Sequence, residues 1–321
     1  MIIPQNKWRR YRTEYGICIN EKCEVVNTQY LLPHYTNKIQ MIFTSPPFPL
    51  NRAKKYGNLN GEEYKKWLCD VIESMIPLLT DTGSIVIEVG NAWNSGEPTF
   101  STLPMETLLE IKSKCGLNLC QEFIYHNPAR LPTPIQYVNI DRIRVKDSFT
   151  RIWWLSKTSR PKANNKKVLT QYSKQMQKLL SSGKYNAGNR PSEHSISETA
   201  FNKDNGGAIP SNVLIASNTN SQDAYLIGCK KKGLKIHPAR MPMDIPNFFI
   251  NFLTDERPNK CKCKFRYRQP DVNTKVEYLD NNMLKLDYVR TKAVTEGQVC
   301  VLYDGDICLG GGIIKEVKEN N

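Results

Sequence analysis

Apolar and polar positions in the first third of the chain follow two different periods. Residues 38–43 (KIQMIF) are typical of a short buried strand, and the prolines that follow end it abruptly. Residues 62–79 carry apolar side chains at helical spacing, residues 81–83 (DTG) predict a turn, and residues 84–90 predict a second buried strand. The pattern therefore predicts a strand, a loop, a helix and a strand in succession.

The same alternation continues through the middle of the chain. A helical pattern at 105–114 and apolar runs at 119–125 and 151–155 are expected of an open α/β sheet. Residues 157–203 interrupt it with ten Lys or Arg, only two acidic residues, and many Ser, Asn and Gln. This basic, polar insertion fits either a solvated linker or a region that contacts phosphates and base edges.

The last third changes character after residue 255. Residues 237–254 predict a proline-rich entry and then a helix from about residue 245. Short apolar runs divided by Asp, Asn and Gly turns predict strands at 265–268, 274–279, 283–288, 299–303 and 312–317. We expect a domain boundary near 255–260, followed by a small barrel or sandwich.

Composition narrows the class of protein. A chain of 321 residues, 40% of them hydrophobic, can bury a sizeable core. Its longest apolar runs are far too short to cross a bilayer, and it begins with aromatic and basic residues where a signal peptide needs an apolar stretch. We therefore expect a soluble, cytoplasmic protein with no membrane partner.

Charge and cysteines refine this prediction. The net charge of +14 favours a nucleic-acid partner, because each Lys or Arg that displaces a counterion adds affinity for a polyphosphate, although ordinary basic solubility gives the same charge. Ten cysteines are scattered without answering CxxC pairs, so reduced thiols are expected. The pair Cys261 and Cys263 has no neighbouring His or second Cys pair, and we read both as strand residues and expect no metal.

The chemistry-bearing candidate is the pentapeptide TSPPF that follows the first strand. An exocyclic base amine is a poor nucleophile because its lone pair is delocalised into the ring. The hydroxyl of Ser45 and the carbonyl of Pro46, which Pro47 frees from helical hydrogen bonding, could accept both amine protons and localise that lone pair. The base must leave the duplex to be reached, and the ring of Phe48 could stack on it.

The stretch FTSPPFPLNRAKKYGN closely resembles the PvuII-type cytosine-N4 DNA methyltransferases, and the likeness covers roughly residues 15–255. Further matching blocks are SIVIEVGNAW, EFIYHNPARLPTPIQY, RIRVKDSFTRIWWLSKTSRPK, KDNGGAIPSNVLIASNT and HPARMPMDIPNFFINFLT. The resemblance implies methyl transfer from S-adenosylmethionine to duplex DNA in a restriction-modification system. It also implies catalytic residues Ser45, Pro46, Pro47 and Phe48, and cofactor-binding residues Thr44, His237, Pro238, Arg240, Pro242 and Phe248.

The DNA-binding candidates follow the motif or lie in the basic insertion. They are Arg52, Lys54, Lys55, Tyr56, Lys166, Lys167, Arg190 and Lys203. Cytosine-C5 chemistry is disfavoured, because it needs a cysteine nucleophile, usually after proline, and no cysteine here follows a proline. Adenine-N6 enzymes typically carry Asp where this chain has Ser45, so adenine stays open as a less favoured target.

The resemblance breaks after residue 255, where the family continues with a strand and a glycine-rich cofactor loop. Here residues 256–260 form a junction, and 261–317 resemble the terminal β-barrel of tRNA-specific 2-thiouridylases, which suggests RNA as a second partner. Gly310–Gly312 lack the strand, GxGxxG spacing and helix of a nucleotide loop. In the family the missing piece supplies strands beside 38–43, so its loss would leave that strand at an exposed edge.

We therefore predict an α/β fold with an incomplete doubly wound, Rossmann-like methyltransferase sheet and a small C-terminal β-barrel. Residues 1–255 would form the catalytic region, with a target-recognition insertion at 157–235, and residues 261–321 the barrel. Three functions remain open. They are a sequence-specific DNA methyltransferase, either active or impaired by loss of the cofactor loop, a non-catalytic nucleic-acid-binding fusion, and a chain complemented by a separate cofactor-binding fragment.

Overall fold

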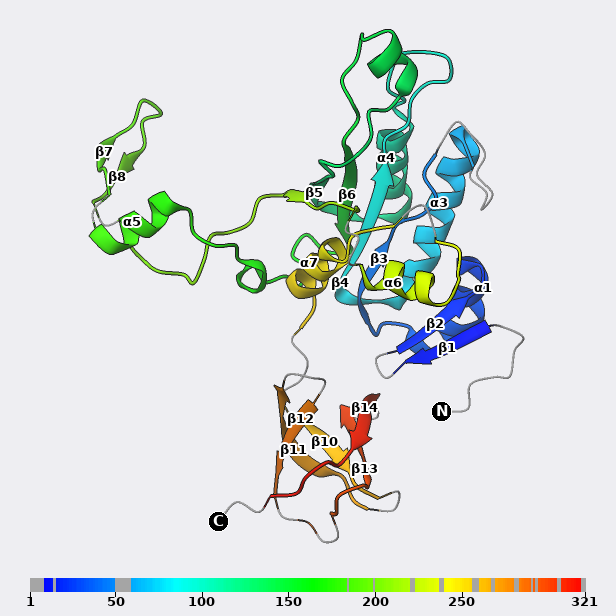
Figure 1. Cartoon of the computed structure of the whole chain (residues 1–321), viewed down its shortest axis with the longest axis vertical. Helices are drawn as coiled ribbons and strands as arrows, with labels where there is room; N and C mark the ends of the chain where they lie inside the picture. The colour runs from blue at the N-terminus through cyan, green and yellow to red at the C-terminus, as the bar shows by residue number, and fades with distance from the viewer. Residues whose placement is uncertain are drawn as a thin grey trace. The chain divides into compact units, whose positions relative to one another are not determined.

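The structure is a computed structural model in which most of the chain is described. The described residues are 9–13, 16–49, 59–183, 185–198, 200–219, 223–236, 240–255, 260–266, 269–279, 283–289, 291, 294–304 and 307–318. The chain divides into two compact units (Figure 1). One is Asn27–Thr254, and the other contains Asp255–Asn321 together with Met1–Val26.

A five-stranded mixed sheet forms the centre of the larger unit. Its order is β3-β4-β6-β5-β9, and the strands are β3 (Ile39–Thr44), β4 (Leu79–Gly90), β6 (Phe149–Ser156), β5 (Asn118–His126) and β9 (Val213–Ile215). β3 is parallel to β4, and β9 is parallel to β5, whereas β6 runs antiparallel to both of its neighbours. All the strands predicted for this region are confirmed.

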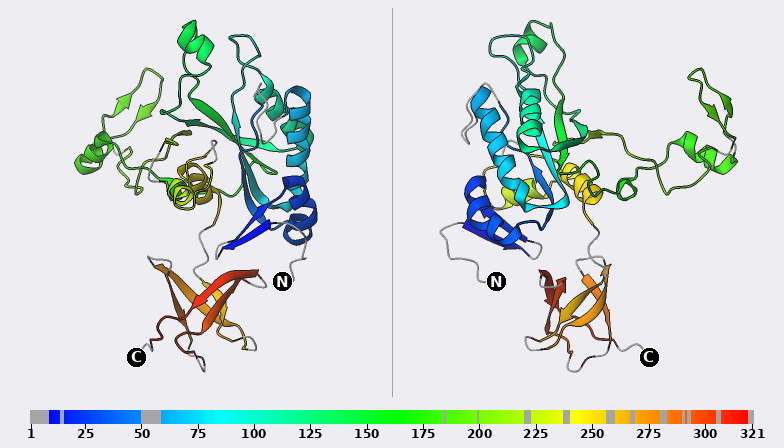
Figure 2. Two further views of the ribbon diagram at one scale, coloured as in Figure 1. Left: turned by 45° about the vertical axis from the view of Figure 1, so that its right-hand side comes forward. Right: turned by 180° about the vertical axis from the view of Figure 1, so that it is seen from behind.

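Helices cover both faces of this sheet (Figures 1 and 2). α3 (Gly61–Met75) and α4 (Leu103–Cys115) bury apolar side chains such as Leu68 and Ile111 against Ile87 of β4 and Trp153 of β6. On the other face, α7 (Asp244–Leu253) packs its Phe249 into a second cluster. Two helix layers around a central sheet confirm the predicted doubly wound arrangement.

Within the described residues, β3 pairs only with β4 and therefore lies at one edge of the sheet. Its side chains are all half-buried, because helices lie over both faces while one long side of the strand has no neighbour there. Ile39 and Ile42 pack against the α3 side, and Met41 and Phe43 pack against the α7 side. The edge position is the one that the resemblance implied.

Two predictions about this region were wrong in detail. Residues 81–83 do not form a turn between elements, since β4 runs without interruption through them; the ladder with β3 instead shifts register between Ile39 and Met41. The irregularity absorbs the extra residues that the DTG sequence introduces. The predicted helix at 62–79 ends at Met75, because Pro77 starts a separate 3-10 turn, Ile76–Leu78.

The larger unit also contains small elements outside the sheet. They are the π-helical turns Asn27–Leu31 and Gln136–Ile140, the 3-10 turn Asn165–Val168, α2 (Leu32–Tyr35), α5 (Lys174–Ser182), β7 (Gly188–Asn189), β8 (Ser195–Ile196) and α6 (Ala224–Lys231). α5, β7 and β8 belong to the basic insertion, and no side chain of α5 is buried. The insertion thus lacks a core of its own around this helix.

The other unit is an antiparallel five-stranded sheet that forms a half-barrel. Its order is β12-β11-β10-β13-β14, with β10 (Lys260–Lys264), β11 (Val272–Leu279), β12 (Met283–Tyr288), β13 (Val299–Asp304) and β14 (Ile307–Ile313). Cys263, Phe265, Cys300 and Leu302 form its core. The unit also includes a hairpin of β1 (Arg9–Thr13) and β2 (Gly16–Asn20), and the short helix α1 (Cys23–Val26).

Three of the five strands predicted for the half-barrel are confirmed, and two are displaced along the chain. The strand predicted at 265–268 is wrong: β10 occupies Lys260–Lys264, where Lys and Cys alternate and Cys263 is buried. The strand predicted at 312–317 begins earlier, because Gly310–Gly312 belong to β14. An added Cβ at Gly311 would lie 2.4 Å from the carbonyl oxygen of Cys300, so the glycine permits close strand packing.

Candidate functional site

The TSPPF motif lies at the carboxyl end of β3. Thr44 is the last residue of the strand and pairs with Ile87 of the parallel strand β4, which places Ser45 beside the carboxyl end of β4. The carboxyl ends of neighbouring parallel strands are where open α/β sheets commonly form their sites. Pro46 is buried, whereas Ser45 and Pro47 are exposed, so the motif is anchored and still faces solvent.

A buried carboxylate lies directly behind Ser45. The Ser45 hydroxyl donates a hydrogen bond to Oε2 of Glu88 at 2.8 Å, and the Thr150 hydroxyl donates to Oε1 of the same side chain at 2.9 Å. Glu88 belongs to β4 and is only 5% exposed, and Thr150 belongs to the adjacent strand β6. Three strands therefore contribute one hydrogen-bonded group.

Burial raises the pKa of Glu88 above the ordinary glutamate value, because the low-dielectric interior disfavours the charge. The hydrogen bonds from Ser45 and Thr150, and then the positive charge of Arg130, lower the pKa and offset part of this effect. Nearby, burial raises the pKa of Tyr125 to about 12, with a smaller contribution from Glu88. Glu88 thus suits a group that exchanges a proton.

The hydrogen-bond direction decides what Ser45 can do. Because its proton points to Glu88, the oxygen lone pairs of Ser45 remain free to accept from an external donor. A charged acceptor behind the hydroxyl also makes that oxygen more electron-rich. The outward lone pairs of Ser45 can therefore accept a hydrogen bond from an N–H donor.

The ring of Phe48 lies against the backbone of Gly90, the last residue of β4. A Cβ added at Gly90 would lie 2.3 Å from Cδ2 and 2.7 Å from Cε2 of that ring, closer than any real contact. Only glycine therefore lets the ring occupy this position. Phe48 is half-buried, so part of the ring remains able to contact another flat group.

A polar cluster continues the site beyond Gly90. The amide of Asn91 donates to Oδ1 of Asp147 at 2.9 Å and to the carbonyl oxygen of Phe149 at 3.1 Å. Nη1 of Arg130 donates to the same carbonyl at 2.9 Å and lies 3.9 Å from Oδ1 of Asp147. The cluster joins β4 to the segment that leads into β6, and so holds Thr150 near Glu88.

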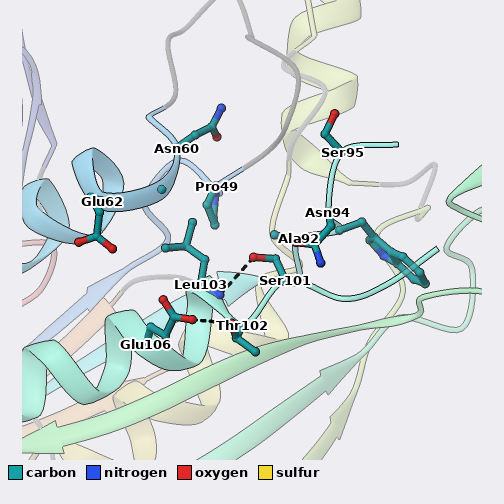
Figure 3. A pocket seen from close by; sticks show the side chains of 12 residues that line it. Pro49, Asn60, Glu62, Ala92, Asn94, Ser95, Ser101, Thr102, Leu103 and Glu106 are labelled. Carbon is teal, nitrogen blue, oxygen red and sulfur yellow. Dashed lines mark hydrogen bonds between the residues drawn. The ribbon is translucent and has the colours of Figure 1, made fainter. Parts of the chain in front are cut away.

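A cavity of about 310 Å³ adjoins the motif on its Pro49 side (Figure 3). It lies where the first turns of α3 and α4 approach the segment after β4. Its lining is Pro49, Asn60, Gly61, Glu62, Ala92, Trp93, Asn94, Ser95, Ser101, Thr102, Leu103 and Glu106. Ser45 and Phe48 do not line it, so the cavity is a neighbour of the site rather than the site itself.

Of the described residues predicted to bind the cofactor, Thr44 lies beside Ser45 and others make contacts within the fold. Thr44 is half-buried beside Ser45, but the guanidinium of Arg240 donates to the carbonyl oxygen of Asn218 at 3.2 Å and lies 3.8 Å from Asp223. Phe248 packs edge-on to Phe123 in the α7 cluster, and Pro242 is buried. His237 and Pro238 lie outside the described residues.

The DNA-binding candidates are dispersed. Arg52, Lys54, Lys55 and Tyr56 lie outside the described residues. Lys166 and Lys203 are exposed, and Nζ of Lys167 donates to the carbonyl oxygen of Thr254, the residue after α7, at 3.1 Å. Arg190 lies 5.8 Å above the Tyr185 ring. The structure thus brings none of the described four candidates into the Ser45 group.

Sequence reasoning missed Glu88, Thr150 and Gly90. The available signal was an acidic residue inside the otherwise apolar run SIVIEVG, since a charge in a buried strand needs a partner.

In the half-barrel, Cys263 and Cys300 are buried, and the described residues hold no group of three or more His, Cys, Asp or Glu that could bind a metal. No helix in the described ranges is long and apolar enough to span a membrane.

Comparison with known proteins decides the family. The sequence profile of the DNA methylase family, which covers N6 and N4 enzymes, matches residues 39–259. The chain belongs to this family. Within it, the chain is 42% identical over 219 residues to the type II methyltransferase M.PvuII of Proteus hauseri, a match that covers 68% of this chain and 65% of that protein. The predicted likeness to the PvuII type is confirmed.

Solved structures agree with this assignment. The cytosine-N4-specific PvuII DNA methyltransferase superposes with a TM-score of 0.53 at 35% identity, over 70% of this chain and 67% of the other. The chain thus spans about two thirds of the length of the methyltransferase that it matches. The family match at residues 39–259 includes the TSPPF motif.

The second resemblance is also confirmed. Residues 243–314 match the aminomethyltransferase β-barrel domain family. The tRNA-specific 2-thiouridylase MnmA of Mycoplasmopsis synoviae is 50% identical over 58 residues, which are 18% of this chain and 16% of that protein. The family match thus includes α7 as well as the half-barrel, and the likeness to the tRNA enzyme covers only a small part of that protein.

Proposed function

We propose that this chain is a site-specific DNA methyltransferase that modifies the N4 amine of cytosine in duplex DNA, as part of a restriction-modification system. The observation that carries the proposal is the hydrogen bond from Ser45 to the buried Glu88. It leaves the Ser45 oxygen facing outward as an acceptor, beside a half-buried aromatic ring. The 42% identity to M.PvuII supports the choice of cytosine N4 over adenine.

The chain's own residues would act on the amine in three ways. An extruded cytosine stacks on Phe48, which positions its amine near the carboxyl end of β3. One amine proton is accepted by Ser45 and the other by the carbonyl of Pro46, and these bonds localise the nitrogen lone pair. Pro47 keeps that carbonyl out of helical hydrogen bonding.

Glu88 would complete the proton path. Methylation makes the amine nitrogen positively charged, so it must lose one proton. That proton passes to Ser45 while the Ser45 hydroxyl proton moves to Glu88, so Ser45 remains neutral and Glu88 ends as the acid, to be deprotonated later by solvent. A raised pKa makes Glu88 a better acceptor in this step than an exposed glutamate.

S-adenosylmethionine would supply a methyl group bound to a positively charged sulfur. Thr44, half-buried beside Ser45, would contact it, whereas Arg240 and Phe248 make contacts within the fold. We propose that methylation by this chain is impaired, because the sequence after residue 255 continues into the half-barrel strands instead of a glycine-rich cofactor loop.

The same proposal includes the organisation of the chain. Residues 1–255 would be the catalytic region with target recognition at 157–235, 256–260 the junction, and 261–321 the thiouridylase-like barrel. Exposed Lys166 and Lys203, with Arg190, would contact DNA phosphates. We expect a cytoplasmic location, where the DNA is found.

Transfer of tritiated methyl groups from S-adenosylmethionine to unmethylated DNA tests the proposal. We expect weak but measurable labelling by the wild type and none by Ser45→Ala, which removes the acceptor, or by Phe48→Ala, which removes the stacking face. Ser95→Ala is the matched control, because Ser95 lines the neighbouring cavity. Labelling that persists in both motif variants would contradict the assignment.

A second candidate function is a non-catalytic nucleic-acid binder in which the barrel contacts RNA. The likeness of residues 243–314 to a tRNA-enzyme barrel and the net charge of +14 favour it. Two results together would support this function over the first. The chain would transfer no labelled methyl groups to DNA, and it would bind a tRNA transcript only when residues 243–314 are present.

A further inference from the structure

The loop between β5 and β6 presents an unusual number of apolar side chains to solvent. It spans residues 127–148 and projects from the end of the two strands in Figure 1. The five large aliphatic residues that are more than half exposed are Leu131, Ile135, Ile140, Ile143 and Val145, with Val145 at 86% and Leu131 at 76%. Single exposed aliphatics are ordinary, but five within one loop need an explanation.

The base of this loop is held firmly. The amide N–H of Asn127 donates to the carbonyl oxygen of Ser148 at 2.9 Å, and the N–H of Asp147 donates to that of Thr133 at 3.0 Å. Both bonds cross the loop near its ends. The exposed aliphatics therefore belong to an ordered element whose neck is closed by backbone hydrogen bonds.

A neighbouring segment braces the loop from the side. Nε of Arg144 donates to the carbonyl oxygen of Pro98 at 2.9 Å, and the rings of Tyr137 and Trp93 lie 6.3 Å apart. Trp93 also lies 4.3 Å from the ring of Phe100. Since Trp93, Pro98 and Phe100 follow β4, the loop is fixed to the same end of the sheet as the TSPPF motif.

The loop joins the site through its last residues. Asp147 accepts from Asn91 beside Gly90, and Thr150, two residues after Ser148, donates to Glu88. The positive charge of Arg130, near the start of the loop, lowers the pKa of Glu88. The two ends of the loop therefore lie beside the Ser45 and Glu88 pair.

The charge of the loop indicates which substrate it suits. Arg142, Arg144 and Lys146 alternate with the aliphatic residues Ile143 and Val145, and all five are exposed. Within the described residues Arg142 makes no hydrogen bond or ion pair. Arg144 and Lys146 donate only to uncharged backbone carbonyls, so their charges are not neutralised by these contacts. An exposed apolar surface flanked by such cations matches a duplex, where phosphates border the stacked bases.

We propose that this loop is a wedge that enters duplex DNA beside the extruded base, with Leu131 and Val145 filling the space that the base leaves. The inference rests on the proposed function for its partner, DNA. It adds the element that holds the duplex open, because an apolar side chain between base steps replaces the lost stacking. Ser45, Phe48 and Glu88 then act on a base that the wedge keeps out of the helix.

The test is DNA binding by the full chain, which does not require methyl transfer. Fluorescence anisotropy would compare a matched duplex with the same duplex carrying one C·A mismatch. We expect the wild type to bind the mismatched duplex about tenfold more tightly, because a mismatched base costs less to extrude. The double variant Leu131→Asn, Val145→Asn should bind both duplexes equally, with matched-duplex affinity changed less than about threefold, since phosphate contacts remain.

Leu109→Asn is the matched control, since Leu109 is 65% exposed on α4, and it should keep the wild-type preference. Thermal unfolding of both variants checks that each remains folded. An unchanged preference in the double variant, or equal binding of both duplexes by the wild type, would overturn the wedge alone. Failure of the wild type to bind either duplex would overturn the DNA partner and the proposed function with it.

Discussion

Glu88 determines whether the Ser45 hydroxyl is free to donate or to accept a further hydrogen bond. An isolated serine hydroxyl can donate or accept, but a carboxylate oxygen 2.8 Å away accepts its hydrogen bond and leaves the lone pairs outward. The same carboxylate is 5% exposed, so its charge depends on Ser45, Thr150 and the field of Arg130. Ser45 and Glu88 therefore form a hydrogen-bonded pair in which each residue influences the protonation or orientation of the other.

The raised pKa of Glu88 predicts an acid limit to activity. The ionised form accepts the Ser45 proton, so methyl transfer should fall as the pH drops through the raised pKa of Glu88, which lies above the ordinary value of 4.5. Labelling rates measured against pH should show this limb in the wild type. Glu88→Gln should lower the rate about 10²-fold or more and remove the limb. A Gln variant that retained the same acid limb would assign it to another group.

The close contact between Gly90 and Phe48 leads to a second prediction, which is purely steric. Gly90→Ala would place a methyl group 2.3 Å from Phe48 Cδ2, so the ring must leave its position, and we expect loss of labelling with a stability cost of about 1–3 kcal/mol. Gly228→Ala is the control, because nothing lies within 4 Å of the added atom on helix α6. Labelling measured beside urea unfolding separates the two effects. Full activity of Gly90→Ala would show that Phe48 need not occupy this place.

Ser45, Pro46 and Phe48 could be found at the residue scale from sequence, because the motif is contiguous and its chemistry is local. The sequence marks Glu88 only as a charge within an apolar run, and it gives no reason to pair Glu88 and Thr150 with Ser45. Glu88 lies 43 positions after Ser45, and Thr150 lies 62 positions after Glu88. Their contact depends on β3, β4 and β6 being neighbours in the sheet.

At the scale of elements, α7 is what supports the edge strand β3. The ring of Phe249 lies 5.7 Å from that of Phe43 in β3 and 5.0 Å from that of Phe123 in β5, and its side chain is fully buried. α7 therefore spans the outer strand and an inner one on the same face. Within the described residues β3 has a strand neighbour on one side only, and the packing of α7 supports it.

Phe249→Ala should consequently destabilise the larger unit by about 3–5 kcal/mol, since it deletes a fully buried ring and leaves a cavity. Ile250→Ala, on the exposed side of the same helix at 44% exposure, should cost less than about 1 kcal/mol. Urea unfolding followed by tryptophan fluorescence measures both. Equal effects of the two substitutions would contradict the packing role of α7.

The hydrophobic periodicity of the sequence predicted most helices and strands, but the first and last residues of the strands depended on pairing with neighbouring strands. β4 begins at Leu79 because Leu79 pairs with Ile39, even though the DTG sequence after it favours a turn. β10 begins at Lys260 because it lies between β11 and β13, which stabilise its alternating Lys and Cys residues. In β4, hydrogen bonds from the neighbouring strand outweigh the local turn preference of residues 81–83.

At the scale of the whole molecule, the edge position of β3 and the lack of a glycine-rich loop lead to a prediction about the cofactor. Calorimetric titration of the purified chain with S-adenosylmethionine should show no tight binding, because Arg240 and Phe248 are already engaged within the fold. A known intact methyltransferase in the same buffer is the positive control. Binding in the micromolar range without any added protein would contradict the proposed impairment.

The sequence by itself determined the alternation of helices and strands, the strand that ends in TSPPF, and the membership of the DNA methylase family, since these depend on contiguous residues. Only the tertiary structure decided that Glu88 lies behind Ser45, that Gly90 makes room for Phe48, and that the loop at 127–148 is braced beside them. The physical reason is that strand order and side-chain burial arise from contacts between residues distant in the chain, which no local pattern encodes.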